Sequence, residues 1–447
     1  MLSSRERPPL TSEIPEDATP ADPADAEADY DAFVRKHLRR NYLGHYLHGM
    51  LGMTGFRVLA APTLLPAFLA TLAPAASASA FVGLGLALQQ AGQIISPVIG
   101  ANLVEHRKRV LPAATLMGSL MRAAILLLAV AAWFLDGKTL AVVVLALLFA
   151  YGFFQGAQRV VFQLLLAKAI PIERRGRLQA YRNMTGGAIA AVLSWFAGRF
   201  LIQHNVLGNG YAVTFLIVFV LTSLGLTALR LLMIEPEPPA LRPRTRLRER
   251  LKDFDGLIHA DPNYRNFLVA QALAVGGRMA APLYVLHAAQ RVGLTGASLG
   301  LFSLVYLGAD TASNLAWGHM GDRGGFRSNF VGAMALGALG LGAMIFAHSE
   351  PVFLLAFVAL GASNAGYQMS AQTLILEFGA RQDIAMRLGI SATIEGVVSS
   401  AAPLIGGLIG VAVGYPPAFA IAMGLQLASL IVLLMGVREP RSLKAVS

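Results

Sequence analysis

The most restrictive feature of this sequence is a series of long apolar runs. Examples are AILLLAVAAWFL (residues 124–135), LAVVVLALLFAYGFF (140–154) and IAMGLQLASLIVLLMGV (421–437). Such runs fill a window of about 19 residues, and about 20 apolar residues cross the hydrocarbon core of a bilayer as a helix. Charged residues make up only 14% of the chain, and the mean hydropathy is +0.59. The sequence therefore predicts an all-α membrane protein.

We expect twelve transmembrane helices. The predicted spans cover roughly residues 44–70, 80–103, 110–134, 140–168, 183–203, 211–233, 265–289, 296–318, 329–347, 352–377, 387–411 and 416–437. The longest connector between them, residues 234–264, divides the chain into an N-terminal six-helix bundle (41–233) and a C-terminal six-helix bundle (265–437). Within this linker, Leu247, Leu251, Phe254, Leu257 and Ile258 share one helical face, which is typical of an amphipathic helix on a membrane surface.

Connectors rich in lysine and arginine alternate with connectors that are poor in them. The rich set includes RKHLRR (35–40), HRKR (106–109), ERRGR (173–177) and REPRSLK (438–444). Since positively charged connectors stay in the cytoplasm, this alternation places both termini there, in a protein of the cytoplasmic (inner) membrane. We expect residues 1–40 to form an acidic disordered tail (1–31) followed by a basic juxtamembrane segment, and residues 438–447 to form a second cytoplasmic tail.

Composition also excludes several functions. The chain has no cysteine, so disulfides, thiolate metal sites and cysteine nucleophiles are absent. The net charge of +11 comes from the connectors, which argues against a nucleic-acid partner. Without an HExxH, GxSxG or Walker-type motif, we expect no enzyme activity, no metal and no cofactor.

The two halves of the chain repeat each other weakly. NYLGHYLHGMLGMTGFRVLAAP (41–62) is similar to NFLVAQALAVGGRMAAP (266–282), and GFFQGAQRVVFQLLLAKAIPIERRGRLQ (152–179) is similar to GASNAGYQMSAQTLILEFGARQDIAMRLG (361–389). Parallel repeats of six helices imply two pseudo-symmetric bundles related by an axis along the membrane normal.

The first repeated segment carries an arginine near the middle of a predicted span, Arg57 in one half and Arg278 in the other. An arginine at that depth costs about 2.5–3.5 kcal/mol on insertion scales, so each needs a wet cavity, a counter-ion or a ligand. Asp310 and Glu395 are the plausible counter-ions, and both lie in the second half. We therefore expect Arg278 to be paired and Arg57 to be unpaired. Bonds to unwound backbone near the following prolines, or a salt bridge between the bundles, are the structural alternatives.

The connector GHMGDRGGFR (318–327) resembles the motif of the major facilitator superfamily that joins helices 2 and 3, and helices 8 and 9. The weaker counterpart GANLVEHRKR (100–109) lacks the second glycine. The resemblance implies the major facilitator fold, a central cavity lined by the helices of Arg57 and Arg278, and a gating role for the connectors. The gating residues are then Gly318, Asp322, Arg323, Gly325, Arg327, Glu105 and Arg109.

The resemblance also implies a secondary active transporter that works by alternating access, binds a small-molecule substrate within the lipid bilayer and acts as a monomer. Arg57 and Arg278 together resemble the arginine pair of the organophosphate–phosphate antiporter branch, which favours a small organic or phosphorylated anion, with proton coupling or anion exchange. Further substrate-binding candidates are Arg159, Gln158, Gln89, Tyr367 and Gln368, and the proton-coupling candidates are Asp310 and Glu395.

The alternative is a proton-driven exporter of hydrophobic or cationic compounds. Two departures count against it: Gly152 stands where drug exporters have an arginine, and residues 184–199 lack their Gly-Pro motif. Its expected signature is an unpaired acid in the cavity.

Overall fold

The computed structural model describes residues 23–104, 107–237, 259, 261–378 and 384–440, and these residues form helices and short connectors without a strand. The first half contains α1 (Pro23–Ala60), α2 (Leu64–Thr71), η1 (Ala75–Ser77), α3 (Ala78–Val104), α4 (Leu111–Phe134), α5 (Gly137–Ala169), α6 (Ile172–Phe196), η2 (Ala197–Ile202), η3 (Val206–Gly208) and α7 (Gly210–Leu232). The second half contains α10 (Pro262–Gly276), η4 (Gly277–Leu283), α11 (Tyr284–Val292), α12 (Gly296–Gly324), α13 (Phe326–Phe346), α14 (Glu350–Leu374), η5 (Ile375–Glu377), α15 (Ile384–Val413) and α16 (Tyr415–Gly436).

The expected N-terminal tail is described only in part, and the expected amphipathic helix of the linker is not described. Residues 23–31 were expected in a disordered tail, but they are the start of the 38-residue helix α1. Their alanines and acidic residues are compatible with a helix that continues into a membrane span. Residues 1–22 and the predicted amphipathic helix around Leu251 lie outside the described residues.

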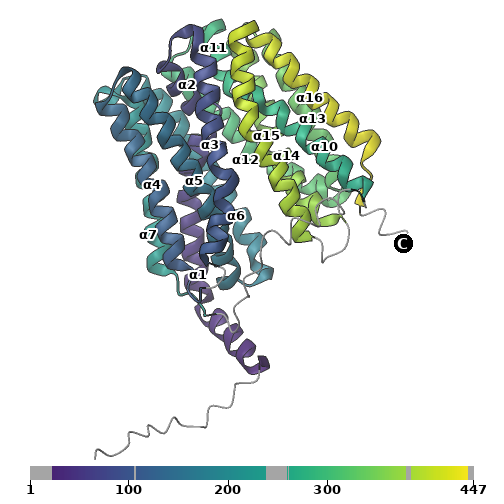
Figure 1. The fold of residues 1–447 in the computed structure, drawn as a ribbon. Helices are drawn as coiled ribbons and strands as arrows, with labels where there is room; N and C mark the ends of the chain where they lie inside the picture. Colours follow the sequence, from purple (N-terminus) through teal and green to yellow (C-terminus); the bar gives the residue numbers. More distant parts are fainter. Residues whose placement is uncertain (1–22, 105–106, 238–258, 260, 379–383, 441–447) are drawn as a thin grey trace, which may run out of the picture.

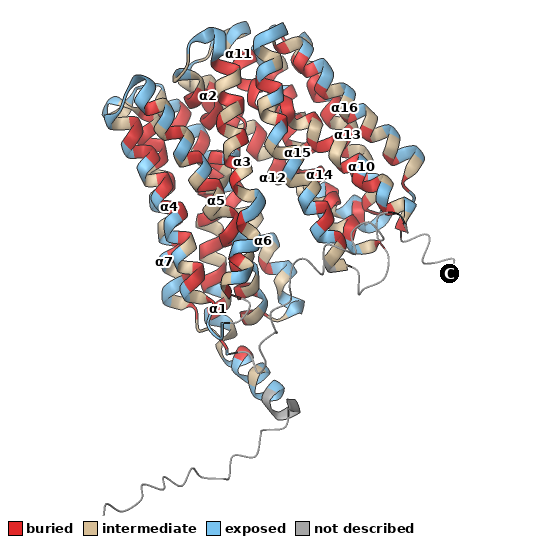
Figure 2. Cartoon of the chain, viewed as in Figure 1, coloured by how far each residue is buried: buried red, intermediate tan, exposed pale blue. Residues whose placement is uncertain are grey.

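Ten helical segments in the described part of the chain are long and apolar enough to cross a membrane, and α1 with α2 forms an eleventh if the bent pair is one span. The twelfth long helix is α12, whose 29 residues include Asp310, Asp322 and Arg323 and are less apolar as a result. Many large apolar side chains point outward: Leu339 is 70% exposed and Leu355 is 69% exposed. Figure 2 shows that buried residues lie between the helices and that exposed residues cover the outside of the bundles.

The helices form two bundles that meet at one end only. The largest cluster of buried apolar side chains draws from both halves of the chain, including Leu65 and Phe302. Two other clusters belong to one bundle each, around Val161 in the first and Phe267 in the second. In Figure 1 the bundles converge at the end with α2 and α11 and separate toward the end at which α1 begins and α16 ends. We call these the closed end and the terminal end.

Each half begins with a helix that is broken at the repeated Ala-Ala-Pro sequence. The axis bends by 45° between α1 and α2, where Pro62 lies. In the second half Pro282 lies within η4, a 3₁₀ segment between α10 and α11. Proline lacks the N–H that an α-helix needs and clashes with the preceding turn, which explains both breaks. Arg57 lies in the last turn of α1, and Arg278 lies within η4, four residues before Pro282.

The bundles are joined by α3 against α15 and by α6 against α12, and glycines permit the close approach. A Cβ on Gly83 of α3 would lie 2.3 Å from the carbonyl oxygen of Pro403 in α15. A Cβ on Gly300 of α12 would lie 2.6 Å from the carbonyl oxygen of Trp195 in α6. Hydrogen bonds add to this contact at the closed end, where Ser79 donates to the Gly407 carbonyl over 3.0 Å.

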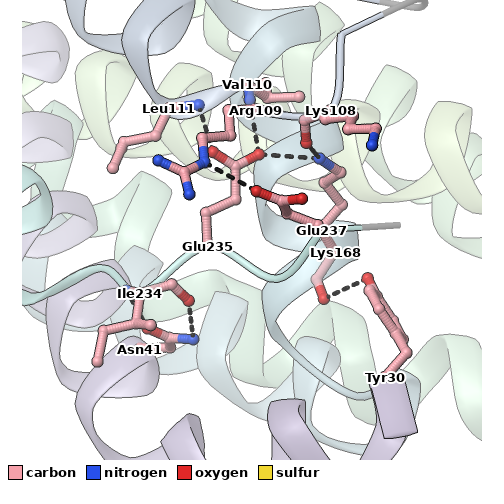
Figure 3. A network of polar contacts seen from close by, with 10 residues as sticks. All are labelled: Tyr30, Asn41, Lys108, Arg109, Val110, Leu111, Lys168, Ile234, Glu235 and Glu237. Carbon is pink, nitrogen blue, oxygen red and sulfur yellow. Dashed lines mark hydrogen bonds and ion pairs between the residues drawn. The ribbon is translucent and has the colours of Figure 1, made fainter. Parts of the chain in front are cut away.

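A polar network, partly buried and partly exposed, joins the start of the linker to the first bundle at the terminal end (Figure 3). The Glu235 carboxylate accepts from the backbone N–H groups of Val110 (2.6 Å) and Leu111 (2.8 Å), and so caps the N-terminus of α4. The same carboxylate pairs with Lys168 of α5 over 2.8 Å.

The extended α1 takes part in the same network. Its Asn41 side chain exchanges two hydrogen bonds with the backbone of Ile234, and its Tyr30 hydroxyl donates to the carbonyl of Lys168. A phenol is protonated at neutral pH and can donate, and partial burial raises the pKa of Tyr30 above its ordinary value. The second half repeats part of this arrangement, because Asn263 exchanges two hydrogen bonds with Arg438 and Glu439 accepts from the N–H of Arg327.

Candidate functional site

A cavity of about 410 Å³ lies between the two bundles. Its wall includes both helix breaks and residues of α3, α5, α10, α12, α13, α14, α15 and α16. Among the described residues, the first bundle supplies only Gln89, Gln90 and Arg159 as polar lining. The second bundle supplies many more polar groups, so most of the polar wall of the cavity belongs to the second bundle.

Arg278 lines this cavity and is held by neutral groups. Its Nη2 donates to Oδ1 of Asn364 over 2.5 Å, and its guanidinium lies 5.3 Å from the centre of the Tyr367 ring. The described residues contain no ion pair between Arg278 and a carboxylate. The expectation of a paired Arg278 is therefore wrong in this structure.

Arg57 forms the ion pair instead. Its Nη1 lies 2.7 Å from Oδ2 of Asp310 in the opposite bundle and 3.1 Å from the hydroxyl of Thr311. Both side chains are largely buried, with exposures of 18% for Arg57 and 11% for Asp310, and neither belongs to the cavity lining. The expectation of an unpaired Arg57 is also wrong: Asp310 lies on the face of α12 that meets the first bundle, which hydropathy and spacing do not reveal.

Asn364 connects these two sites. Its Nδ2 donates to Oδ1 of Asp310 over 2.8 Å while its Oδ1 accepts from Arg278. Arg57, Asp310, Asn364 and Arg278 thus form one hydrogen-bonded chain from the contact between the bundles to the cavity wall.

The other substrate-binding candidates have mixed positions. Arg159 lines the cavity and is exposed to it, and no described residue forms an ion pair with it. Gln89, Tyr367 and Gln368 also line the cavity. Gln158 does not, because it is buried inside the first bundle beside Gly118 of α4.

Glu395 is a cavity-lining acid without a cationic partner among the described residues. Its Oε2 accepts a long hydrogen bond of 3.4 Å from Gln271, whose own oxygen accepts from Ser391 over 2.7 Å. Sequence reasoning missed Gln271 and Ser391. The available signal for Gln271 was its position two helical turns before Arg278, which places both on one side of the span.

The predicted gating residues lie at the terminal end. Asp322 and Arg323 are exposed at the end of α12, and no hydrogen bond or ion pair of theirs is described. Gly325 ends this helix with a φ of +81°, which favours glycine, and Arg327 donates to the carbonyls of Leu433 and Leu434 over 3.0 Å. Arg109 pairs with Glu237 over 3.1 Å, Gly318 has open space around it, and Glu105 lies outside the described residues.

Two repeated helical bundles around a shared polar cavity are the architecture of a membrane transporter. The sequence model of the Major Facilitator Superfamily matches residues 49–273 and, a second time, residues 267–447. The chain therefore belongs to the major facilitator superfamily, and the fold predicted from its sequence is confirmed.

Solved structures with the same fold transport different solutes. A D-xylose–proton symporter has a TM-score of 0.72 at 13% identity, with 91% of this chain and 99% of that chain covered. The nucleoside transporter NupG gives 0.65 at 12% identity, covering 88% and 98%. The human organic anion transporter MFSD10 gives 0.58 at 15% identity, covering 88% and 99%. A comparison with curated protein sequences finds no match. At these identities the likeness shows the fold alone.

Proposed function

We propose that this protein is a secondary active transporter that moves a small solute bearing a phosphate or carboxylate group by alternating access. The observation that carries the proposal is the pair of cavity-lining arginines from opposite bundles, Arg159 and Arg278, neither of which forms an ion pair with a described carboxylate. A guanidinium offers several donors in a fixed plane and suits an oxyanion. A solute held between two bundles also fits alternating access, in which the bundles rock about a central site.

Within this proposal, Arg57 is not a substrate ligand, since Asp310 neutralises it. Glu395 is the proton-carrying group, because it lines the cavity and no described residue forms an ion pair with it. Binding of a proton to Glu395 would couple solute movement to the proton gradient. Exchange of one anion for another is the second form of coupling that the arginines support.

We further propose that the terminal end faces the cytoplasm, in the cytoplasmic membrane. The support is the set of basic residues that gathers there on α1 and α6, namely Arg35, Lys36, Arg39, Arg40, Arg174, Arg175 and Arg177. The structure then represents the cytoplasm-open conformation of a protein with twelve spans. Asp322 and Arg323 would make their gating contacts in the opposite conformation, when the terminal end closes. Because one chain carries both bundles, we expect the monomer to be the working unit.

The test is the melting temperature of the detergent-purified protein with a panel of solutes: phosphate, sugar phosphates, carboxylates, neutral sugars and lipophilic cations. A solute at about 100 times its dissociation constant adds roughly 2.7 kcal/mol of stability. We expect an anion to stabilise the wild type but neither Arg159→Gln nor Arg278→Gln. Arg265→Gln is the matched control, since Arg265 is exposed on α10 and lies outside the cavity lining.

A second candidate function is the export of hydrophobic or cationic compounds, and one observation favours it: the cavity acid Glu395 has no described cationic partner. Under this alternative, lipophilic cations would stabilise the wild type and both arginine variants, anions would stabilise none of them, and Glu395→Gln would abolish the shift. That pattern would replace the anion proposal.

A further inference from the structure

The Arg57–Asp310 pair is the only described ion pair that joins the two bundles. Other described polar contacts between them near the closed end are neutral. Besides the bond from Ser79 to Gly407, Ser303 donates to Thr63 over 2.8 Å, and Ala297 donates to the side chain of Gln203 over 3.0 Å. Arg57 precedes Thr63 by less than two helical turns. The ion pair therefore lies where the contact between the bundles at the closed end stops, toward the middle of the protein. Opening of the closed end requires these bundles to part at that point.

Asp310 is held from two sides. One carboxylate oxygen accepts from Arg57 across the bundle contact, and the other accepts from Asn364 within its own bundle. Removal of the Asn364 donor would therefore free the carboxylate to rotate away from Arg57.

The orientation of the Asn364 amide depends in turn on Arg278. An amide presents an acceptor at one end and donors at the other, so it bridges a cation and a carboxylate in one orientation only. Here Oδ1 faces Arg278 and Nδ2 faces Asp310, as the charges require. If Arg278 turned toward an occupant of the cavity, Oδ1 would lose its charged donor, and the bond from Nδ2 to Asp310 alone would hold the amide.

We infer that Asn364 couples the state of the cavity to the contact between the bundles. In this arrangement, engagement of Arg278 by a cavity occupant releases Asn364, loosens Asp310 and weakens its pair with Arg57, which promotes opening of the closed end. Asn364 is thus a positioning residue for the conformational change. The inference rests on the proposed function only for the nature of the occupant, an anion.

The test measures conformation without any ligand, so it stands apart from the binding assay above. The natural chain has no cysteine, which allows two label sites to be introduced into an unmodified background. Gly176 at the start of α6 and Gly389 near the start of α15 suit this purpose, because both are exposed at the terminal end and a Cβ there meets nothing within 4 Å. Spin labels on Gly176→Cys and Gly389→Cys then report the distance between the bundles in lipid nanodiscs.

We expect Asp310→Asn to shift the distribution toward shorter distances, as the terminal end closes when the closed end opens. Arg278→Gln should shift it the same way by a smaller amount. In an Asn364→Leu background, Arg278→Gln should have no further effect, because the amide that carries its influence is gone. Asn364→Ser should give the same result as Asn364→Leu, because the serine hydroxyl is too short to reach either Arg278 or Asp310. It serves as the second variant if Asn364→Leu does not fold.

Gln290→Leu is the control, an exposed amide on α11 outside the cavity lining, and it should leave the distances unchanged. The inference is overturned if Arg278→Gln leaves the wild-type distribution unchanged. It is also overturned if the effect of Arg278→Gln is undiminished when Asn364 is replaced, since independent sites give additive changes.

Discussion

Arg57 and Arg278 occupy corresponding places in a repeated sequence, yet the structure gives them different partners. Each lies a few residues before the proline of the same Ala-Ala-Pro sequence, at which its helix is broken. Arg57 meets an acid of the opposite bundle, Asp310 of α12, and is neutralised there. The counterpart of α12 in the first bundle is α3, which contains no acidic residue between Ala78 and Val104. Arg278 therefore remains in its own bundle, on Asn364 and Tyr367.

The difference teaches that a repeated motif fixes where a side chain lies but not what it does. The same arginine becomes part of the bundle contact in one half and part of the cavity wall in the other. The difference between the two arginines depends on a single carboxylate, that of Asp310 on α12. The predictions below test whether that carboxylate accounts for the difference.

The largest expected effect concerns the partner of Arg57. Asp310→Asn leaves Arg57 buried without a counter-ion, and loss of one member of a buried pair costs about 3–5 kcal/mol. Arg278→Gln removes a hydrogen bond and a ring contact but strands no buried charge, so we expect a loss of roughly 1 kcal/mol. Thermal unfolding in detergent measures both.

The double variant Arg57→Gln with Asp310→Asn is the internal control. Because it removes both charges, it should be more stable than Asp310→Asn alone. Equal losses for Asp310→Asn and Arg278→Gln would show that the two arginines do not differ in the way described here.

A smaller effect, on anion affinity, is expected when Arg278 is given a carboxylate partner like that of Arg57. Asn364→Asp gives Arg278 a carboxylate partner, as Arg57 already has. It also sets a carboxylate oxygen against Asp310 in place of the Asn364 donor, so the spin-label distance is measured beside the affinity. The neutralised Arg278 should then bind a cavity anion roughly tenfold more weakly, which corresponds to about 1.4 kcal/mol. The melting-temperature titration with the stabilising anion measures this change. An unchanged affinity in Asn364→Asp would mean that the charge of Arg278 does not contribute to binding.

Much of the fold could be predicted because it depends on hydropathy and repetition. Apolar runs marked the spans, and the repeated halves implied two bundles, since both signals are local in sequence. The start of α1 at Pro23 was missed because composition suggested a tail, although the same alanines also suit a helix. The pairing of Asp310 was missed for a different reason: it depends on the direction in which α12 presents its acid, and that direction is set by packing between the bundles. Sequence alone could propose Asp310 as a partner but could not choose between two arginines at equal depth.

The smallest expected effects test whether burial, rather than charge alone, governs such pairs. The network of Figure 3 contains a buried pair and an exposed pair side by side. Lys168 and Glu235 are 9% and 5% exposed, whereas Arg109 and Glu237 are 72% and 49% exposed. We expect Lys168→Gln to cost about 1–3 kcal/mol, because it removes a charged hydrogen-bond donor from a buried carboxylate. Arg109→Gln should cost roughly 0–1 kcal/mol.

Salt concentration separates the two contributions further. A Debye length of about 3 Å at 1 M ionic strength screens exposed charges, so the effect of Arg109→Gln should vanish there while most of the effect of Lys168→Gln persists. Unfolding of both variants at low and high salt provides the measurement. If the two substitutions cost the same and respond to salt alike, burial does not set the strength of ion pairs in this protein. The contrast between the neutralised Arg57 and the cavity-facing Arg278 would then need another explanation than the carboxylate of Asp310.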